Sequence, residues 1–199
     1  MLDVIACDPP LDAKEFCADD GPGHVGRLKQ TPDGRYALAR GLSAMRETIA
    51  RNTEARVVLG GKLSGFAGLM PGIVEEVLLA IRRRQPLFIA GGFGGAAHLV
   101  ADAIEGRRPA QLRRQYQESM EQPYLETLRL YEQRRKQSPN LDLSDMDYTA
   151  AASELEKYGV QGLAATNGLT EKENHELFTT GSVDAAVYLT MKGLSAIQR

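Results

Sequence analysis

The sequence lacks several features that mark specialised classes of protein. It contains no tryptophan, and its two cysteines, Cys7 and Cys17, are too few for a disulfide framework and have no partners at zinc-ligand spacing. No apolar run approaches the roughly 20 residues that span a bilayer, and the N-terminus has neither the basic nor the apolar stretch of a signal peptide. The formal net charge of −2 gives no indication of a nucleic-acid surface. We therefore expect a cytoplasmic, reduced protein with no metal site and neither membrane nor nucleic acid as partner.

Glycine, in contrast, is concentrated in two turns. The first turn spans residues 60–72, after the apolar run 56–59 and before a segment of helical pattern that begins at Ile73. The second turn spans residues 91–95, after the apolar run 87–90 and before a second helical segment at 96–104. Strand, glycine turn and helix, repeated in this order, are typical of a parallel sheet whose ligands bind at the carboxyl ends of the strands.

The pattern predicts an α/β fold: a Rossmann-like, doubly wound, mainly parallel sheet with few strands and a helical C-terminal extension. Residues 3–7 are a possible third strand. Helices are expected at residues 37–52, 73–84, 96–104, 110–136, 147–158 and 183–194, the fourth of them with a break at Gln122–Pro123. A further helix is expected to start at the capping box Thr170–Glu173. We assign residues 1–108 to the ligand-binding domain and 109–199 to a helical extension packed on it. Because so few strands make a poor sheet, we expect a homo-oligomer or a partner domain to complete it, unless the chain is part of a longer protein.

The two turns predict a pocket for a phosphate-bearing nucleotide. Glycine lets the backbone approach a ligand, and the start of the following helix offers unpaired N–H groups and a partial positive charge. Neither turn is a Walker motif or a clean dinucleotide fingerprint, and no cofactor is predicted. The candidate ligand-binding residues are Gly60, Gly61, Lys62, Ser64, Glu76, Gly91, Gly92, Phe93, Gly94 and Gly95.

Other interpretations of these residues stay open. Glu75 or Glu76 is a candidate general acid or base for cleavage of an N-glycosidic bond, with His98 in support. The carboxylates equally suit the dipole of a helix start, and a lone histidine is more often a packing residue than a catalyst. The glycines themselves have a structural alternative, close packing of helix on sheet.

Two further groups of residues have structural interpretations. The spacing of Tyr116, Tyr124 and Tyr131 places them on a common face, which favours core packing or a helix–helix interface over base stacking. Asn167–Gly168 marks a turn before the capping box, for which structural use is the better interpretation.

Residues 57–102 resemble the SMF/DprA–LOG superfamily, often called SLOG. The resemblance rests on Leu59-Gly60-Gly61-Lys62, on the run from Met70 to Glu76, and on the run from Gly91 to Ala97. It is closest to the predicted sensor branch, whose members carry two SLOG units in one chain. The resemblance implies a Rossmann-like fold that binds a nucleotide-derived small molecule, as a sensor or signal-binding module in bacterial defence or stress signalling.

The same resemblance implies an alternative, a nucleoside or nucleotide N-glycosidase or transferase related to the LOG phosphoribohydrolases. In those enzymes the second loop reads Pro-Gly-Gly-x-Gly-Thr-x-x-Glu, and the glutamate takes part in catalysis. Here Ala90 stands in place of the proline, Gly95 in place of the threonine and His98 in place of the glutamate. Nucleotide binding is therefore better supported by the comparison than hydrolysis.

Overall fold

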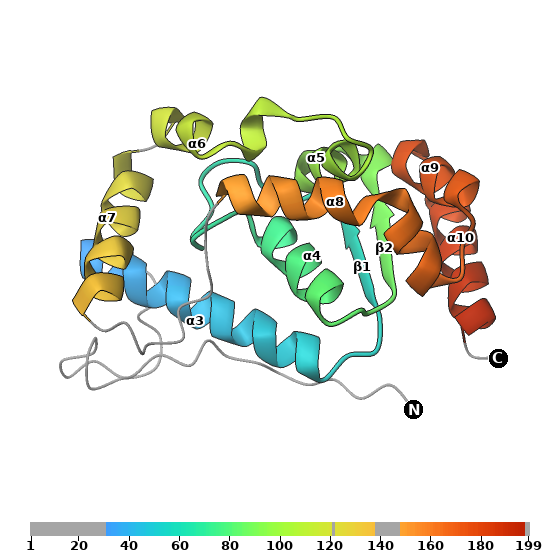
Figure 1. Ribbon diagram of the computed structural model, residues 1–199, viewed down its shortest axis with the longest axis horizontal. Helices are drawn as coiled ribbons and strands as arrows, with labels where there is room; N and C mark the ends of the chain where they lie inside the picture. Colours follow the sequence, from blue (N-terminus) through green and yellow to red (C-terminus); the bar gives the residue numbers. More distant parts are fainter. Residues whose placement is uncertain (1–30, 121, 138–147, 198–199) are drawn as a thin grey trace.

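The computed structural model describes residues 31–120, 122–137 and 148–197 (Figure 1). The possible strand at residues 3–7 lies outside this part of the chain. The described elements, in order, are α3 (Pro32–Arg51), β1 (Arg56–Leu59), α4 (Gly72–Arg82), β2 (Leu87–Ala90), the 3-10 turn η1 (Gly91–Phe93), α5 (Gly95–Ile104), the 3-10 turn η2 (Ala110–Leu112), α6 (Arg114–Met120), α7 (Gln122–Gln137), α8 (Tyr148–Asn167), α9 (Glu171–Thr179) and α10 (Val183–Ile197). In this part of the chain no helix combines the length and the apolar character needed to cross a membrane.

The two strands are parallel neighbours. Arg56 lies opposite Leu87 at one end of the pair, and Leu59 lies opposite Ala90 at the other. The described chain is therefore mostly helical with a small parallel sheet, which agrees with the α/β prediction and with the expectation of few strands. A doubly wound, Rossmann-like sheet would be larger than these two strands.

Helices cover the sheet from two sides. On one side, Val58 and Ile89 belong to the larger hydrophobic cluster, which includes Val77 of α4 and Val100 of α5. On the other side, Phe88 packs in a second cluster with side chains from α9 and α10. In Figure 1, α4 lies on one side of the strands and α9 and α10 lie on the other, while α8 crosses in front of them. β2 is buried along its whole length, whereas β1 exposes every second side chain from Val57.

Local capping signals fix several helix ends. The Thr170 hydroxyl accepts a hydrogen bond from the Glu173 amide, and the Glu173 carboxylate accepts one from the Thr170 amide, so the predicted capping box is confirmed. α3 begins before residue 37, because Thr31 caps the Gly34 amide and a proline fits the first helical position.

Of two further helix boundaries expected from the sequence, one is wrong and one is confirmed. The helix predicted to end at Tyr158 continues to Asn167 across a kink at Gly159, whose φ of 61° interrupts the helical backbone. The predicted break near Pro123 is confirmed between α6 and α7, and it leaves this proline in the first turn of α7. Proline is tolerated there because the first N–H groups of a helix have no partner within it.

Candidate functional site

The two glycine turns lie side by side at the carboxyl ends of β1 and β2. Main-chain hydrogen bonds join them: the Ala96 amide donates to the Gly61 carbonyl at 3.1 Å, and the Ala97 amide donates to the Gly60 carbonyl at 2.8 Å. The contact is so close that a Cβ on Gly95 would lie 2.5 Å from the Gly61 oxygen. The turns therefore form one hydrogen-bonded unit.

This contact corrects one expectation about the start of α5. Its first N–H groups were expected to be unpaired and available to a phosphate, but those of Ala96 and Ala97 already donate to carbonyl oxygens of the first turn. The reason is topological: parallel neighbours end at the same edge of the sheet, so the glycine turns that follow them come within hydrogen-bond distance. The amides of Ala96 and Ala97 are therefore engaged within the protein and cannot both remain so and bind a phosphate.

Several of the candidate glycines are required by packing. A Cβ on Gly92 would lie 1.9 Å from the Thr180 oxygen, and one on Gly91 would lie 2.7 Å from the Phe178 oxygen, so the end of α9 lies directly against the second turn. A Cβ on Gly61 would lie 2.5 Å from the Cγ1 atom of Ile73. At Gly61, Gly91, Gly92 and Gly95 the structural interpretation therefore accounts for the glycine by itself.

Gly60 and Gly94 are different. Their φ angles of +60° and +75° are in the left-handed region, and a Cβ on either would meet nothing within 4 Å. Lys62 and Ser64, in the first turn, have exposed side chains. These four residues present an ammonium group, a hydroxyl group and two Cα atoms with open space where a Cβ would stand, at the edge where parallel sheets bind ligands.

An apolar groove begins beside the same edge. It has a volume of about 370 Å³ and runs between β1 and α10. Phe93 lies in it next to Gly94 and is partly buried. The lining residues are Val57, Leu59, Ala90, Phe93, Val183, Ala186, Val187, Thr190 and Met191. We call this feature the α10 groove.

The structure places Glu75 and Glu76 in ion pairs with arginines. The Arg46 guanidinium donates to the Glu75 carboxylate at 2.6 Å, and Arg56 donates to Glu76 at 2.9 Å. Glu75 is buried, and the Arg46 guanidinium lies against the backbone of the first turn, where a Cβ on Gly72 would be 2.6 Å from it. The carboxylates therefore bind α4 to α3 and β1.

Sequence reasoning missed both of these arginines. Arg46 lies on a predicted helix and Arg56 opens a predicted strand, but each meets its glutamate across 20 to 29 residues of chain. No local spacing signals such a pair.

His98 lies on the outer side of α5, with 52% of its side chain exposed. Its Nε2 atom is 3.8 Å from the carboxylate of Asp102, one turn along the same helix. Asp102 also forms an ion pair with Arg107 at 2.6 Å. The histidine is thus part of a charged surface group.

Side chains from α6 and α7 anchor the first turn. The Tyr124 hydroxyl donates to the Leu69 carbonyl at 2.9 Å, and its ring meets Phe66 edge-on with the centroids 5.3 Å apart. Gln117 donates to the Leu63 carbonyl at 3.1 Å. Burial raises the pKa of Tyr124, which keeps the phenol protonated as a donor. The predicted core packing of Tyr124 is confirmed. The spacing of the tyrosines in the sequence did not indicate that Tyr124 donates a hydrogen bond to the first turn.

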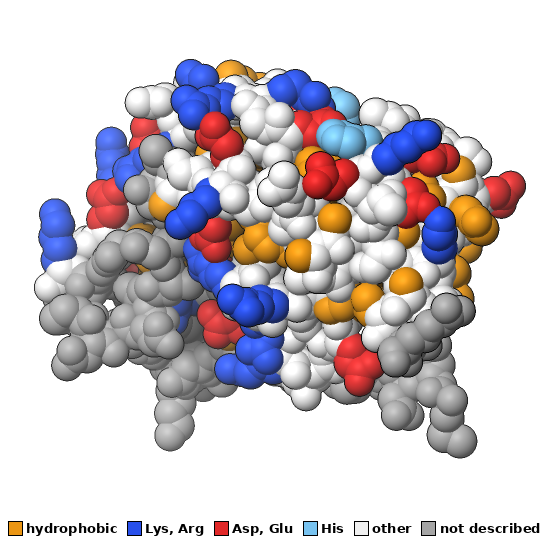
Figure 2. Space-filling model, turned by 45° about the vertical axis from the view of Figure 1, so that its right-hand side comes forward, with side chains coloured by type: hydrophobic (Ala, Val, Ile, Leu, Met, Phe, Trp, Pro, Cys, Tyr) orange, Lys and Arg blue, Asp and Glu red, His pale blue; other side chains and the backbone are white. Residues whose placement is uncertain are grey.

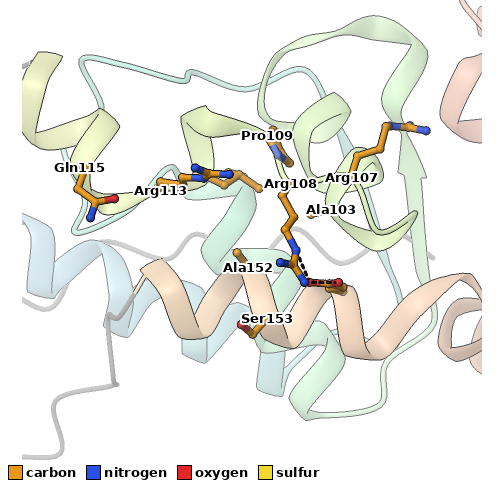
Figure 3. A pocket seen from close by; sticks show the side chains of 10 residues that line it. Ala103, Arg107, Arg108, Pro109, Arg113, Gln115, Ala152 and Ser153 are labelled. Atoms are coloured by element: carbon orange, nitrogen blue, oxygen red, sulfur yellow. Dashed lines mark hydrogen bonds and ion pairs between the residues drawn. The ribbon is translucent and has the colours of Figure 1, made fainter.

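A second cavity of about 370 Å³ lies between α8 and the connection from α5 to α6 (Figure 3). Three arginines line it, yet two are already neutralised: Arg108 pairs with Glu156 at 2.9 Å, and Arg107 points away from the cavity toward Asp102 and Glu105. Compensated charge makes this cavity a weaker candidate for an anionic ligand than the edge with the glycine turns.

The comparisons with known proteins identify the family. The model of the family described as SLOG cluster2 matches residues 5–177, a range that includes β1, β2 and both glycine turns. No curated protein matches the chain, and no solved structure matches it. Because the match covers most of the sequence, it confirms the SLOG resemblance drawn from the glycine motifs. The chain belongs to the SLOG cluster2 family.

Proposed function

We propose that this protein binds a nucleotide-derived small molecule where the two glycine turns meet, and that it acts as a sensor or signal-binding module. Membership of the SLOG superfamily supports a nucleotide-related function in general. The observation that carries the proposal is the pair Gly60 and Gly94, which have left-handed backbone and open space at the carboxyl ends of neighbouring parallel strands. A Rossmann-like sheet and a role in bacterial defence or stress signalling belong to the same proposal.

Each nearby group has a specific task in this proposal. The backbone at Gly60 and Gly94 approaches the ligand, as only glycine permits without a Cβ in the way. The Lys62 ammonium pairs with a phosphate, and the Ser64 hydroxyl donates to a phosphate or ribose oxygen. Phe93, beside Gly94, offers a ring face to the ribose or base.

The ion pairs of Glu75 and Glu76 favour binding over hydrolysis. Both carboxylates at the start of α4 are held by arginines, so their oxygens are engaged within the protein. His98, which stands where phosphoribohydrolases carry a catalytic glutamate, faces Asp102 on the surface of α5. An N-glycosidase or transferase remains the alternative function.

Matched glycine substitutions test the binding site. Gly60→Ala and Gly94→Ala add a methyl group to the ligand edge, whereas Gly106→Ala adds one at a distant turn with φ +80° and the same open surroundings. We expect Gly60→Ala and Gly106→Ala to lose about 1–2 kcal/mol of stability through strain at positive φ. Gly94→Ala should lose more, because the ψ of Gly94, −158°, combines with its φ of 75° in a region essentially restricted to glycine. Only Gly60→Ala and Gly94→Ala should lose binding in calorimetry and in thermal shift with AMP, NAD, ADP-ribose and cyclic ADP-ribose isomers.

Two results would contradict the proposed binding site. Unchanged ligand affinity in Gly60→Ala and Gly94→Ala would leave the glycines with a purely structural role, and no thermal shift with any nucleotide would contradict the pocket. Incubation with the same compounds tests the enzymatic alternative: release of free base that Glu76→Gln abolishes would replace the sensor with an enzyme.

A further inference from the structure

β1 presents an open main-chain edge in the described part of the chain. The Arg56 amide donates to the Pro86 carbonyl at 2.8 Å, so in the parallel ladder the main-chain groups of Arg56 and Val58 face β2. The amides and carbonyls of Val57 and Leu59 then face the opposite way, where the described residues supply no strand. Unpaired edge groups of this kind are a template for a further strand.

The residues of this edge also favour a neighbouring strand. Figure 2 shows acidic and basic side chains over much of the visible surface, but Val57, Val58 and Leu59 bring neither a charge nor a proline to the edge of the sheet. Charges and prolines are two of the devices by which proteins keep an exposed edge unpaired. Val57 is 48% exposed and Leu59 is 55% exposed, whereas their partners on β2, Phe88 and Ala90, are buried. β1 therefore has the composition of an interior strand.

The position of α3 indicates which segment supplies this strand. α3 lies on the same side of the sheet as α4: Arg46 pairs with Glu75 of α4 at 2.6 Å, and Tyr36 packs in the same cluster as Val58 (Figure 1). α4 connects β1 to β2, and α3 leads into β1. Connections between parallel strands are nearly always right-handed, so two that pass on the same side of a sheet step across it in the same direction. A parallel strand that enters α3 therefore lies beside β1, on the side away from β2.

From this topology we infer that residues 3–7 form a third strand, parallel to β1 and paired with its open edge. These residues are the apolar run of strand character in the chain before α3, and residues 8–31 follow them up to the start of that helix. Because parallel strands end at the same edge of a sheet, the chain after Cys7 reaches the ligand edge beside Gly60. The inference makes specific the Rossmann-like sheet that belongs to the proposed function, and it rests on that sheet rather than on the ligand.

Hydrogen exchange of the single amides of β1, followed by NMR on the full chain, tests the inference. In the wild type the amides of Val57 and Leu59 should exchange at least about a hundredfold more slowly than in an unstructured peptide, as the Val58 amide does through its hydrogen bond to β2. Val4→Asp combined with Ile5→Asp places a charge on each face of the third strand and should expel it from the sheet. The protection of Val57 and Leu59 should then be lost, while that of Val58 is kept.

A matched control adds the same charge just after the run. Leu11→Asp combined with Ala13→Asp should leave the exchange of every β1 amide unchanged. The Val58 amide reports whether a variant is folded, because its partner is β2. If Val58 also loses protection in the first variant, the milder pair Val4→Ala and Ile5→Ala takes its place, with the same expected result.

Three results would overturn the inference. The first is exchange at the rate of an unstructured peptide at Val57 and Leu59 in the wild type, which would show that the edge is open. The second is protection that persists after residues 3–7 are changed, which would assign the edge to another segment. The third is protection that disappears on dilution, which would assign it to a second copy of the chain. Because no nucleotide enters these measurements, their failure is distinct from a failure of the proposed binding site.

Discussion

At the scale of single residues, Asn167 shows how one buried amide joins distant parts of the chain. Its Nδ2 group donates to the Leu87 carbonyl of β2 at 2.8 Å and to the Oδ1 atom of Asn174 at 2.8 Å. Its Oδ1 atom accepts from the Leu169 amide at 3.0 Å. The side chain is fully buried, so each of these partners depends on it. The structural use predicted for the Asn167 turn is confirmed.

Asn167→Ala should destabilise the protein by roughly 3 kcal/mol, because it removes the donor to two buried oxygens, the Leu87 carbonyl and the Asn174 Oδ1 atom. Urea unfolding followed by circular dichroism measures the change. Asn52→Ala is the control: this side chain also donates to a carbonyl, that of Thr48, but it is exposed and should cost less than about 0.5 kcal/mol. Equal losses in the two variants would contradict the role given to burial.

At the scale of elements, the start of α9 combines its capping box with an ion pair from α10. The Lys192 ammonium donates to the Glu173 carboxylate, and Thr170 donates to it through both its amide and its hydroxyl group. These hydrogen bonds, that of Lys192 first, lower the pKa of Glu173 from 4.5 to about 2. The folded protein therefore keeps this carboxylate ionised where the unfolded chain takes up a proton.

The contribution of Glu173 to stability should consequently depend on pH. It is fully present above pH 4.5 and is lost as the pH falls through the folded-state pKa of about 2. Glu173→Gln should thus be less stable than the wild type at pH 7, and the difference should narrow on acidification below about pH 5. Thermal unfolding across this range measures it, with Glu171→Gln as a control in the same helical turn. A difference that stays constant down to pH 2 would contradict the assignment.

Elements were predictable from the sequence where the signal is local. The apolar runs around Val58 and Ile89, and the capping box at Thr170, each depend on residues a few positions apart, and the structure has them as expected. The candidate site was predictable only as two separate turns. The hydrogen bond from Ala96 to Gly61 and the ion pair of Arg46 with Glu75 join residues whose proximity is created by folding, so no local pattern contains them.

At the scale of the whole molecule, the small sheet depends on helices that come late in the chain. Leu155 and Leu163 of α8 and Phe178 of α9 are buried in the same cluster as Val58 and Ile89 of the strands. Phe88 on the opposite side of the sheet is covered by Leu177 and other residues of the second cluster. The core is therefore shared by the regions before and after residue 108.

Removal of residues 109–199 should prevent cooperative folding, because β2 would lose the apolar cover on one side and part of it on the other. The fragment 1–108 should show a broad thermal transition without a heat-absorption peak in calorimetry, while residues 1–197 should melt like the full chain. A sharp transition in the shorter fragment would show that residues 1–108 fold without the helical extension.

The two hydrogen bonds that join the glycine turns are made by main-chain atoms. Side chains at this edge can therefore change, and with them the ligand that is recognised, while the alignment of the two turns stays the same. The link also provides an internal reporter: hydrogen exchange at the Ala96 and Ala97 amides measures how often the first turn separates from the second. A ligand that bridges the turns would slow that exchange on both amides together, even if it touched neither of them.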